Sequence, residues 1–457
     1  MAKLKKLIAQ KVAVIGAGWA GCAAAVTLSR QGHQVTLIEA SRTLGGRARK
    51  VDMHGSTLDN GQHILLGAYT ACLGLLRTLK VEQKQAFLRL PLQMVYPHQT
   101  GMQFIAPSLP APLHLFFALI KAQGLERADK MALARFSTTA RWMDWQLNQD
   151  CTVSELLQRY EQTDKLCRLM WNPLCIAALN TPPERASAQV FLNVLRDSLG
   201  AKRAASDMLI PRLDLSRLLP DIAAKFVTEH QGQVITGLSI QSIELQENRT
   251  WRLHELHQHQ SISTEFDSII IATSAEQCKR LIASMQNANQ ESDVPVSFDA
   301  EFSYEPITTC YLQYPASMRL SRPFFALADQ PEQNYWGQFI FDRGQLNTQQ
   351  AGLMAVVISA SGNAIAQSHE QLALAICNQL TTQLQTPELA TPVWSQIITE
   401  KRATFTCAPD LKRPTNSTTI DSLLIAGDYT ACDYPATLEA AVRSGILAAQ
   451  SVPKFKT

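Results

Sequence analysis

The sequence has 457 residues, of which 46% are hydrophobic and 18% are charged, and its formal net charge at pH 7 is +3. This length exceeds what one compact core usually holds, so we expect a globular protein of two domains. The nearly balanced charge provides no concentrated basic surface for a phosphate backbone, so nucleic acid is not an expected partner.

The first clear pattern is a nucleotide-binding unit. Residues 12–15 are apolar, as is typical of a buried parallel strand, and they run into Gly16-x-Gly18-x-x-Gly21. Gly16 permits a tight turn, Gly18 permits close approach of a pyrophosphate to the backbone, and Gly21 lets the next helix lie close to the sheet. That helix, expected over 22–30, would direct its amino terminus at the phosphates.

A second strand is expected over 34–38, and Glu39 stands at its end. A carboxylate about 20 residues after the glycines can accept hydrogen bonds from both ribose hydroxyls. It would also repel a 2′-phosphate. The unit therefore predicts FAD or NAD as the nucleotide.

The continuation distinguishes FAD from NAD. Gly45 and Gly46 offer a second close approach of the backbone, and Arg47 and Arg49 can neutralise a pyrophosphate. A plain dehydrogenase fold has no role for these residues. The arrangement resembles the flavin amine oxidase and phytoene desaturase superfamily, and the resemblance implies that the glycine pair and its arginine line FAD.

Residues 51–67 are expected to form a short strand pair that leads into Asp59-Asn60-Gly61-Gln62-His63. The resemblance implies that Gly61 passes close to the flavin, where a larger side chain would collide with the isoalloxazine ring. The pattern Gly61-x-His63 is similar to that of plant-type phytoene desaturases. His63 is interpreted either as a buried, hydrogen-bonded histidine beside the cofactor or as a proton donor.

Residues 90–199 change to helical segments punctuated by prolines, which predicts an inserted substrate domain. Its most apolar part, residues 110–124, could dip into a bilayer or line a lipid tunnel, but burial in the core is the favoured interpretation. Residues 211–273 return to nucleotide-domain patterns, with a helix over 221–229 and strands over 232–235, 239–244 and 266–273. The resemblance places the backbone of Ile240 near the adenine.

Strands expected over 307–314, 336–341 and 353–359 would form the floor of a substrate pocket. In the tail, a strand over 423–425 runs into Gly427, which permits close approach, and Asp428, which can accept from ribitol hydroxyls or from a phosphate-bound water. Residues 434–439 open a helix whose positive amino end would lie under the flavin C2 carbonyl and stabilise the reduced ring. A second glycine fingerprint is absent from the sequence, so no NAD(P)H site is expected.

The resemblance covers the whole chain and is strongest to the squalene-associated FAD-dependent desaturases, the hydroxysqualene dehydroxylase group of bacterial hopanoid synthesis. It implies an α/β fold in which a Rossmann-like, glutathione-reductase-type FAD domain (residues 1–89, 200–285 and 395–457) is interleaved with an α+β substrate domain (residues 90–199 and 286–394). The tail lacks the cysteine that some amine oxidases use to attach flavin, so FAD would be noncovalent. No metal site is expected, and the implied FAD-binding residues are Gly16, Gly18, Trp19, Ala20, Gly21, Glu39, Ala40, Gly45, Gly46, Arg47, Gly61, Gln62, Ile240, Gly427, Asp428, Ala436 and Thr437.

The chemistry that the resemblance implies is reductive removal of an allylic hydroxyl from an apolar C30 isoprenoid, which gives squalene. Protonation lets water leave, and hydride from reduced flavin reaches the cation. His63 is the candidate acid, with Tyr434 and Asp433 as rivals. The alternatives are a carotenoid desaturase or isomerase, an amine oxidase, and a non-catalytic FAD-bound partner in a lipid-synthesis complex.

The ten cysteines are scattered without a CxxC pattern, which favours free thiols in a reducing cytosol. Lys3, Lys5 and Lys6 precede an apolar run that is too short for a signal peptide and is expected to be a strand. No stretch approaches the ~20 apolar residues of a membrane span. We therefore expect a cytoplasmic protein, peripheral to the inner membrane, that could contact other squalene-pathway enzymes.

Overall fold

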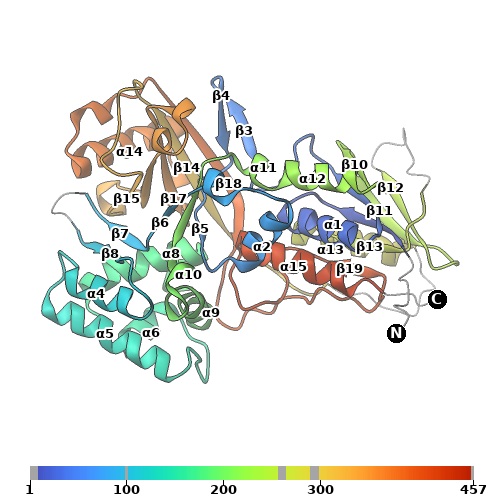
Figure 1. The fold of residues 1–457 in the computed structure, drawn as a ribbon, viewed down its shortest axis with the longest axis horizontal. Coiled ribbons are helices and arrows are strands. Elements are labelled where there is room, and N and C mark those ends of the chain that lie inside the picture. Colours follow the sequence, from blue (N-terminus) through green and yellow to red (C-terminus); the bar gives the residue numbers. More distant parts are fainter. Residues whose placement is uncertain (1–8, 98–100, 256–263, 289–297, 454–457) are drawn as a thin grey trace.

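The computed structural model describes residues 9–97, 101–255, 264–288 and 298–453, so the lysines expected ahead of the first strand lie outside the described residues. Figure 1 shows an elongated molecule. A parallel sheet with its helices occupies one end, and an antiparallel sheet and a group of helices occupy the other. The expected mixed α/β architecture is confirmed.

The parallel sheet has the strand order β10-β2-β1-β13-β19. Its central strands are almost continuously buried, because helices and other segments cover both faces. The carboxyl ends of all five parallel strands meet at one edge, which is where open α/β sheets bind their ligands. The strands are β1 (Lys11–Ile15), β2 (Gln34–Glu39), β10 (Gln233–Thr236), β13 (Ser268–Ile271) and β19 (Leu423–Ile425).

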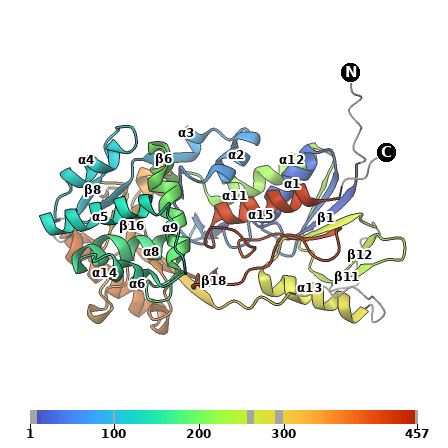
Figure 2. The same ribbon diagram turned by 90° about the horizontal axis from the view of Figure 1, so that it is seen from below.

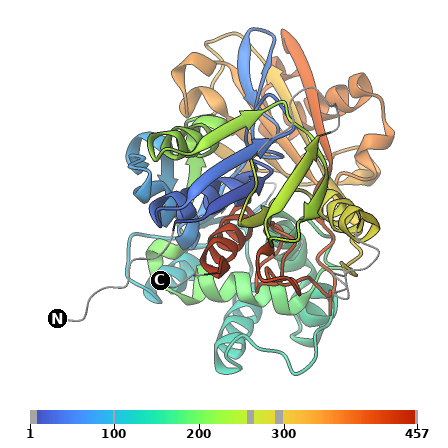
Figure 3. The ribbon, with the colours of Figure 1, turned by 90° about the vertical axis from the view of Figure 1, so that its right-hand side faces the viewer.

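One face of this sheet is covered by α1 (Trp19–Arg30), α12 (Pro220–Glu229) and α15 (Leu438–Ser451). Figure 3, which looks at this end of the molecule, shows α15 beside α1. The two helices approach closely because Gly445 has no side chain: a Cβ there would lie 2.0 Å from the carbonyl oxygen of Ala20. Helices from the start and the end of the chain therefore pack side by side on this sheet.

The second sheet is antiparallel, with the order β15-β16-β17-β14-β18 and α14 (His369–Leu384) packed against it. The expected domain boundary between residues 394 and 395 falls within β18, which begins at Trp394. This strand pairs with β14 from Gln313 opposite Trp394 to Tyr304 opposite Phe405, and we propose that the boundary lies after Phe405. The strands are β14 (Tyr304–Gln313), β15 (Phe324–Ala326), β16 (Phe339–Asp342), β17 (Leu353–Ser359) and β18 (Trp394–Phe405).

Helices from residues 113–195 pack on the face of this sheet opposite α14 (Figures 1 and 2). Trp171 and Phe191 from the helices share one buried cluster with Tyr311 and Phe341 from the sheet. Asn180, at the end of one helix, donates to the carbonyl oxygen of Glu305 at 3.2 Å. We propose that the two sequence segments form one substrate domain. The main helices are α4 (Leu113–Lys121), α5 (Arg127–Trp142), α6 (Val153–Arg159), α8 (Asn172–Leu179) and α9 (Ala188–Leu195).

Further elements lie at both ends of the molecule and between them (Figure 1). Among the described residues, no helix is both long enough and apolar enough to cross a membrane. These elements are β3 (Lys50–Met53), β4 (Ser56–Asp59), β5 (Leu65–Leu66), α2 (Thr70–Thr78), α3 (Gln83–Ala86), β6 (Phe87–Leu90), β7 (Gln93–Val95), β8 (Gln103–Ile105), α10 (Arg203–Ser206), β9 (Met208–Pro211), α11 (Leu215–Leu218), β11 (Ile240–Leu245), β12 (Trp251–Glu255) and α13 (Ala275–Ala288).

The favoured interpretation of residues 110–124 as buried core is wrong for one face of α4. Phe116 and Ile120 are among the exposed large hydrophobic side chains, whereas His114 and Ala118 on the opposite face are buried. Apolar composition alone did not indicate which face would be covered.

Candidate active site

The glycine turn after β1 lies at the carboxyl edge of the parallel sheet. Gly16 donates to the carbonyl oxygen of Ile38 at 2.7 Å. Its φ is +101°, and a Cβ there would lie 2.5 Å from the carbonyl oxygen of Ala272. At Gly21 a Cβ would lie 1.8 Å from the carbonyl oxygen of Gly16. The chain itself therefore requires glycine at both positions.

Gly18 is different, because its φ of −70° is ordinary and no chain atom lies within 4 Å of a Cβ built there. Glycine at this position is therefore explained by a bound group rather than by the protein's own packing. Gly18 also caps α1 without a side-chain hydrogen bond, and the first turn, which contains Trp19, Ala20 and Gly21, has no acidic residue. The amides of this turn can therefore bind an anion such as a pyrophosphate.

Glu39, at the end of β2, holds the turn together. Its Oε2 accepts from the amide of Ala17 at 2.8 Å, and its Oε1 accepts from the amide of Ser41 at 2.9 Å. Each carboxylate oxygen has a further lone pair, so the expected contacts with ribose hydroxyls stay available. Sequence reasoning missed the structural role, since an amide contact within a turn leaves no sequence pattern.

The segment that precedes β11 lies beside Glu39. The amide of Leu238 donates to the carbonyl oxygen of Glu39 at 3.0 Å, and Ile240 begins β11 two residues later with its side chain buried. Ala40 follows Glu39 and is exposed. This places the residues expected near the ribose and the adenine in one neighbourhood.

The second glycine pair meets the first. Gly45 donates to the carbonyl oxygen of Ala17 at 2.9 Å, and a Cβ on Gly46 would lie 3.3 Å from the Cα of Gly18. Both glycines of the pair have left-handed backbones, with φ of +110° and +60°. Arg49, close by, has a buried Nε without a hydrogen-bond partner. An unpaired buried donor beside two open glycine turns fits a phosphate-bearing cofactor such as FAD.

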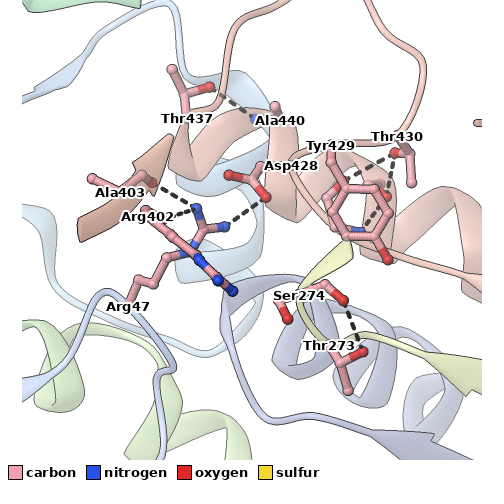
Figure 4. Close-up of polar contacts among 12 residues, drawn as sticks. Arg47, Thr273, Ser274, Arg402, Ala403, Asp428, Tyr429, Thr430, Thr437 and Ala440 are labelled. Carbon is pink, nitrogen blue, oxygen red and sulfur yellow. Dashed lines mark hydrogen bonds and ion pairs between the residues drawn. The ribbon is translucent and has the colours of Figure 1, made fainter. Parts of the chain in front are cut away.

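Arg47 joins the two ends of the chain, as Figure 4 shows. Its Nη2 lies 2.7 Å from Oδ1 of Asp428, and its Nη1 donates to the carbonyl oxygen of Ala403 at 2.6 Å. The carboxylate of Asp428 is nearly buried, with 10% of the side chain exposed. Asp428, expected to accept hydrogen bonds from the cofactor or its bound water, is also held in place by a cation. Gly427 is also fixed, because its amide donates to Oγ of Ser444 at 2.9 Å.

The helix expected from Ala436 begins slightly later. Thr437 caps α15, and its Oγ1 accepts from the amide of Ala440 at 3.1 Å, so Ala436 lies just outside the helix. Buried Glu439 in the first turn accepts from the amides of Ala71 and Cys72 at 2.9 Å each. It therefore anchors the start of α2 and is a structural residue.

Gly61, Gln62 and His63 follow β4 and lie close to the second sheet. The chain atoms nearest to a Cβ on Gly61 are 3.8 Å away, on His63 and Thr309. Nδ1 of His63 lies 2.7 Å from the carbonyl oxygen of Gly61, which can only accept, so Nδ1 carries the hydrogen. Burial lowers the pKa of His63, so at neutral pH its Nε2 is an acceptor.

A buried ion pair supports this segment from behind. Oδ2 of Asp59 lies 3.9 Å from Nη2 of Arg343, and Arg343 also donates to Oε1 of Gln62 at 2.8 Å. The hydroxyl of Tyr311 donates to the carbonyl oxygen of Asp59 at 2.9 Å. Burial raises the pKa of Asp59 to about 6, although Arg343 opposes the shift. Sequence reasoning missed Arg343, because nothing local connects it with a residue so distant in the chain.

The rival acids lie just before α15. Tyr434 donates its hydroxyl to Asp197, and burial raises the pKa of Tyr434 to about 12. Burial alone would raise the pKa of Asp197, but hydrogen bonds from Arg196 and Tyr434 outweigh it and keep the pKa below its ordinary value. Loss of the Tyr434 proton would place a phenolate against a carboxylate. Asp433 lies on the surface, with 71% of its side chain exposed.

Arg413 fixes the loop between β19 and α15, a role that the sequence did not reveal. Its Nη2 donates to the carbonyl oxygen of Asp428 at 2.6 Å, and its Nη1 donates to that of Tyr434 at 2.7 Å. Because one guanidinium binds both ends of the loop, the loop holds a defined shape next to the start of α15.

Comparison with known proteins places this geometry in context. The family model described as flavin containing amine oxidoreductase matches residues 19–453. Hydroxysqualene dehydroxylases from Rhodopseudomonas palustris and Zymomonas mobilis are 27% and 26% identical, covering 97% and 95% of this chain and 99% and 97% of their own. A 15-cis-phytoene desaturase from an Oncidium hybrid is 25% identical, covering 97% of this chain and 77% of its own. The solved cyclohexylamine oxidase from Brevibacterium oxydans has the same fold, with a TM-score of 0.67 at 16% identity over 97% of this chain and 99% of its own.

Proposed function

We propose that this chain, which belongs to the flavin containing amine oxidoreductase family, converts hydroxysqualene to squalene by reductive removal of the allylic hydroxyl. Membership makes the protein an FAD-dependent oxidoreductase. The observation that carries the choice of substrate is the similarity to two hydroxysqualene dehydroxylases along almost the full length of both chains. We place the reaction in hopanoid synthesis, on the cytoplasmic side of the inner membrane.

In the proposed reaction the allylic C–O bond breaks, the hydroxyl leaves with a proton as water, and the carbon gains a hydride. FAD, when reduced, supplies that hydride. The chain's own residues would orient the cofactor: the turn at Gly18 would hold the pyrophosphate, and Glu39 would accept hydrogen bonds from the ribose. The amino terminus of α15 would offset negative charge on the reduced ring, because Arg443 pairs with the first-turn carboxylate of Glu439 at 2.8 Å. An apolar lining would protect the developing cation from water.

None of the three candidate acids is well prepared to give a proton at neutral pH. His63 is held as an acceptor at Nε2, and Tyr434 is bonded to an ionised Asp197. Asp433 is on the surface. We propose that His63 orients the substrate hydroxyl by accepting its hydrogen bond. That His63 is the general acid stays a prediction. The single-turnover rate of a His63→Gln variant tests it.

The test is a product analysis. The purified protein is reduced chemically without oxygen, incubated with hydroxysqualene and extracted for mass spectrometry. Squalene should form, and it should be absent when the flavin is left oxidised. The second candidate function, carotenoid desaturation, is favoured by the similarity to phytoene desaturases. Dehydrogenation of phytoene by the oxidised protein, with no squalene formed by the reduced protein, would replace the proposal with that candidate.

A further inference from the structure

α4 carries an exposed apolar stripe, which we call the α4 stripe. It consists of Leu113, Phe116, Phe117 and Ile120, whose spacing of i, i+3, i+4 and i+7 puts them on one side of the helix. Their exposed fractions are 46%, 56%, 36% and 52%. The opposite side of the helix, with His114 and Ala118, is buried in the substrate domain. The helix is therefore fixed by one face and leaves an apolar face uncovered.

The exposed large hydrophobic side chains are concentrated on two helices. Among the described residues, six of the eleven exposed large hydrophobic side chains lie on α4 and α5: the α4 stripe together with Met131 and Trp142. Single exposed apolar residues are normal, but four large ones on one face of a helix mark an interaction surface. In Figures 1 and 2 both helices lie at the end of the molecule remote from α1 and α15.

Cations border the α4 stripe. Lys121 ends α4, Arg127 begins α5, and Nζ of Lys130 donates to the carbonyl oxygen of Ile120 at 2.9 Å. Two acidic residues lie nearby. Glu126 has 78% of its side chain exposed, but its Oε1 lies 3.5 Å from Nζ of Lys165, and Asp129 is buried in the cap of α5, so the cations outnumber the exposed carboxylate. The surface thus combines large apolar side chains with a positive border.

We propose that α4 docks on an anionic lipid bilayer, with the α4 stripe inserted at the boundary between headgroups and acyl chains. An amphipathic helix that lies in the plane of the membrane combines these two features. A second copy docked by twofold symmetry through the same stripe would bring its cations close to those of the first, so lipid is the occupant that the charges favour. The proposal rests on this surface alone and does not depend on the substrate.

The test is vesicle flotation of the full chain with bound FAD. Vesicles of phosphatidylcholine are compared with vesicles of phosphatidylcholine and phosphatidylglycerol in equal amounts. The double variant Phe116→Ser/Ile120→Ser should partition into the anionic vesicles at least about tenfold more weakly than wild type, since two large side chains lose their insertion. The matched control Leu374→Ser/Val393→Ser removes two exposed apolar side chains elsewhere and should bind like wild type.

The charge component has its own variant. Lys121→Gln/Arg127→Gln should weaken binding to anionic vesicles by about fivefold for each cation and should leave binding to neutral vesicles unchanged. Circular dichroism and flavin absorbance should show that each variant is folded and loaded with FAD. Because the substituted side chains are on the surface, we expect every variant to fold and to bind FAD as the wild type does.

Wild-type binding by the Phe116→Ser/Ile120→Ser variant would overturn the proposal, as would failure of the wild type to bind either vesicle. A lipid-free dimer in sedimentation velocity that this variant abolishes would instead assign the surface to a second copy. Flotation needs no substrate, so its failure leaves the proposed reaction untouched, and failure of the reaction leaves the docking result untouched.

Discussion

The substitution Gly18→Ala tests whether glycine is needed at this position for FAD binding or for stability of the protein itself. The backbone at Gly18 has a φ of −70°, and a Cβ there meets no chain atom within 4 Å. Alanine is a poorer helix cap than glycine but restricts the unfolded chain more, and these two effects oppose each other. The free energy of unfolding of the apoprotein should therefore change by no more than about 1 kcal/mol.

FAD binding should respond much more strongly. A methyl group forced into the space of the pyrophosphate costs about 1–3 kcal/mol, which corresponds to about 5- to 150-fold weaker binding. Affinity is measured by titrating apoprotein with FAD and following flavin fluorescence, and stability is measured by urea unfolding of the same apoprotein.

Two other glycines provide the comparison. Gly362→Ala, at a position with equally open space and no left-handed backbone, should change neither quantity. Gly16→Ala should destabilise the apoprotein itself, because a Cβ there would lie 2.5 Å from the carbonyl oxygen of Ala272. If Gly18→Ala binds FAD as tightly as wild type, the pyrophosphate does not pass this turn and the reasoning is refuted.

Four further outcomes are expected. Arg47→Ala should lower the free energy of unfolding by about 1–3 kcal/mol, because it leaves the nearly buried carboxylate of Asp428 without its cation, and FAD content should also fall; full occupancy would contradict this. Because the pKa of Asp59 is raised from 3.8 to about 6 in the folded protein, stability should fall by roughly 3 kcal/mol as pH rises from about 4 to about 6, and urea unfolding of Asp59→Asn should show this slope removed; an unchanged slope would assign it to other groups. His63→Gln and Tyr434→Phe should each keep the single-turnover rate within about tenfold of wild type, whereas a hundredfold loss would identify a general acid. Acid denaturation should release the flavin into solution, and flavin that stays with the precipitate would show covalent attachment.

The elements that sequence predicted best are those with strong local patterns. β1 was expected over 12–15 and runs from Lys11 to Ile15, and β17 was expected over 353–359 and has those bounds. Apolar runs and glycine spacing are local properties of the chain, so they can be read before the fold is known. The helix after the glycine turn was placed three residues late, because its cap is Gly18 itself.

What sequence could not supply are contacts between distant residues. The pair Asp59 and Arg343, and the pair Arg47 and Asp428, connect segments that meet only after the two sheets are assembled. Arg413 was visible only as a basic residue before a proline. For α4, hydrophobicity predicted burial, but which face of a short apolar helix is covered depends on the neighbouring elements, and these leave Phe116 exposed.

The central claim is the direction of electron transfer to hydroxysqualene. The direct measurement mixes fully reduced protein with hydroxysqualene in the absence of oxygen, follows flavin absorbance and quantifies squalene in samples quenched at the same times. The account predicts that oxidised flavin and squalene appear at the same rate, with one flavin oxidised for each squalene formed, since the substrate gains two electrons as it loses water. A reduced spectrum that does not change, with no squalene formed, would contradict it.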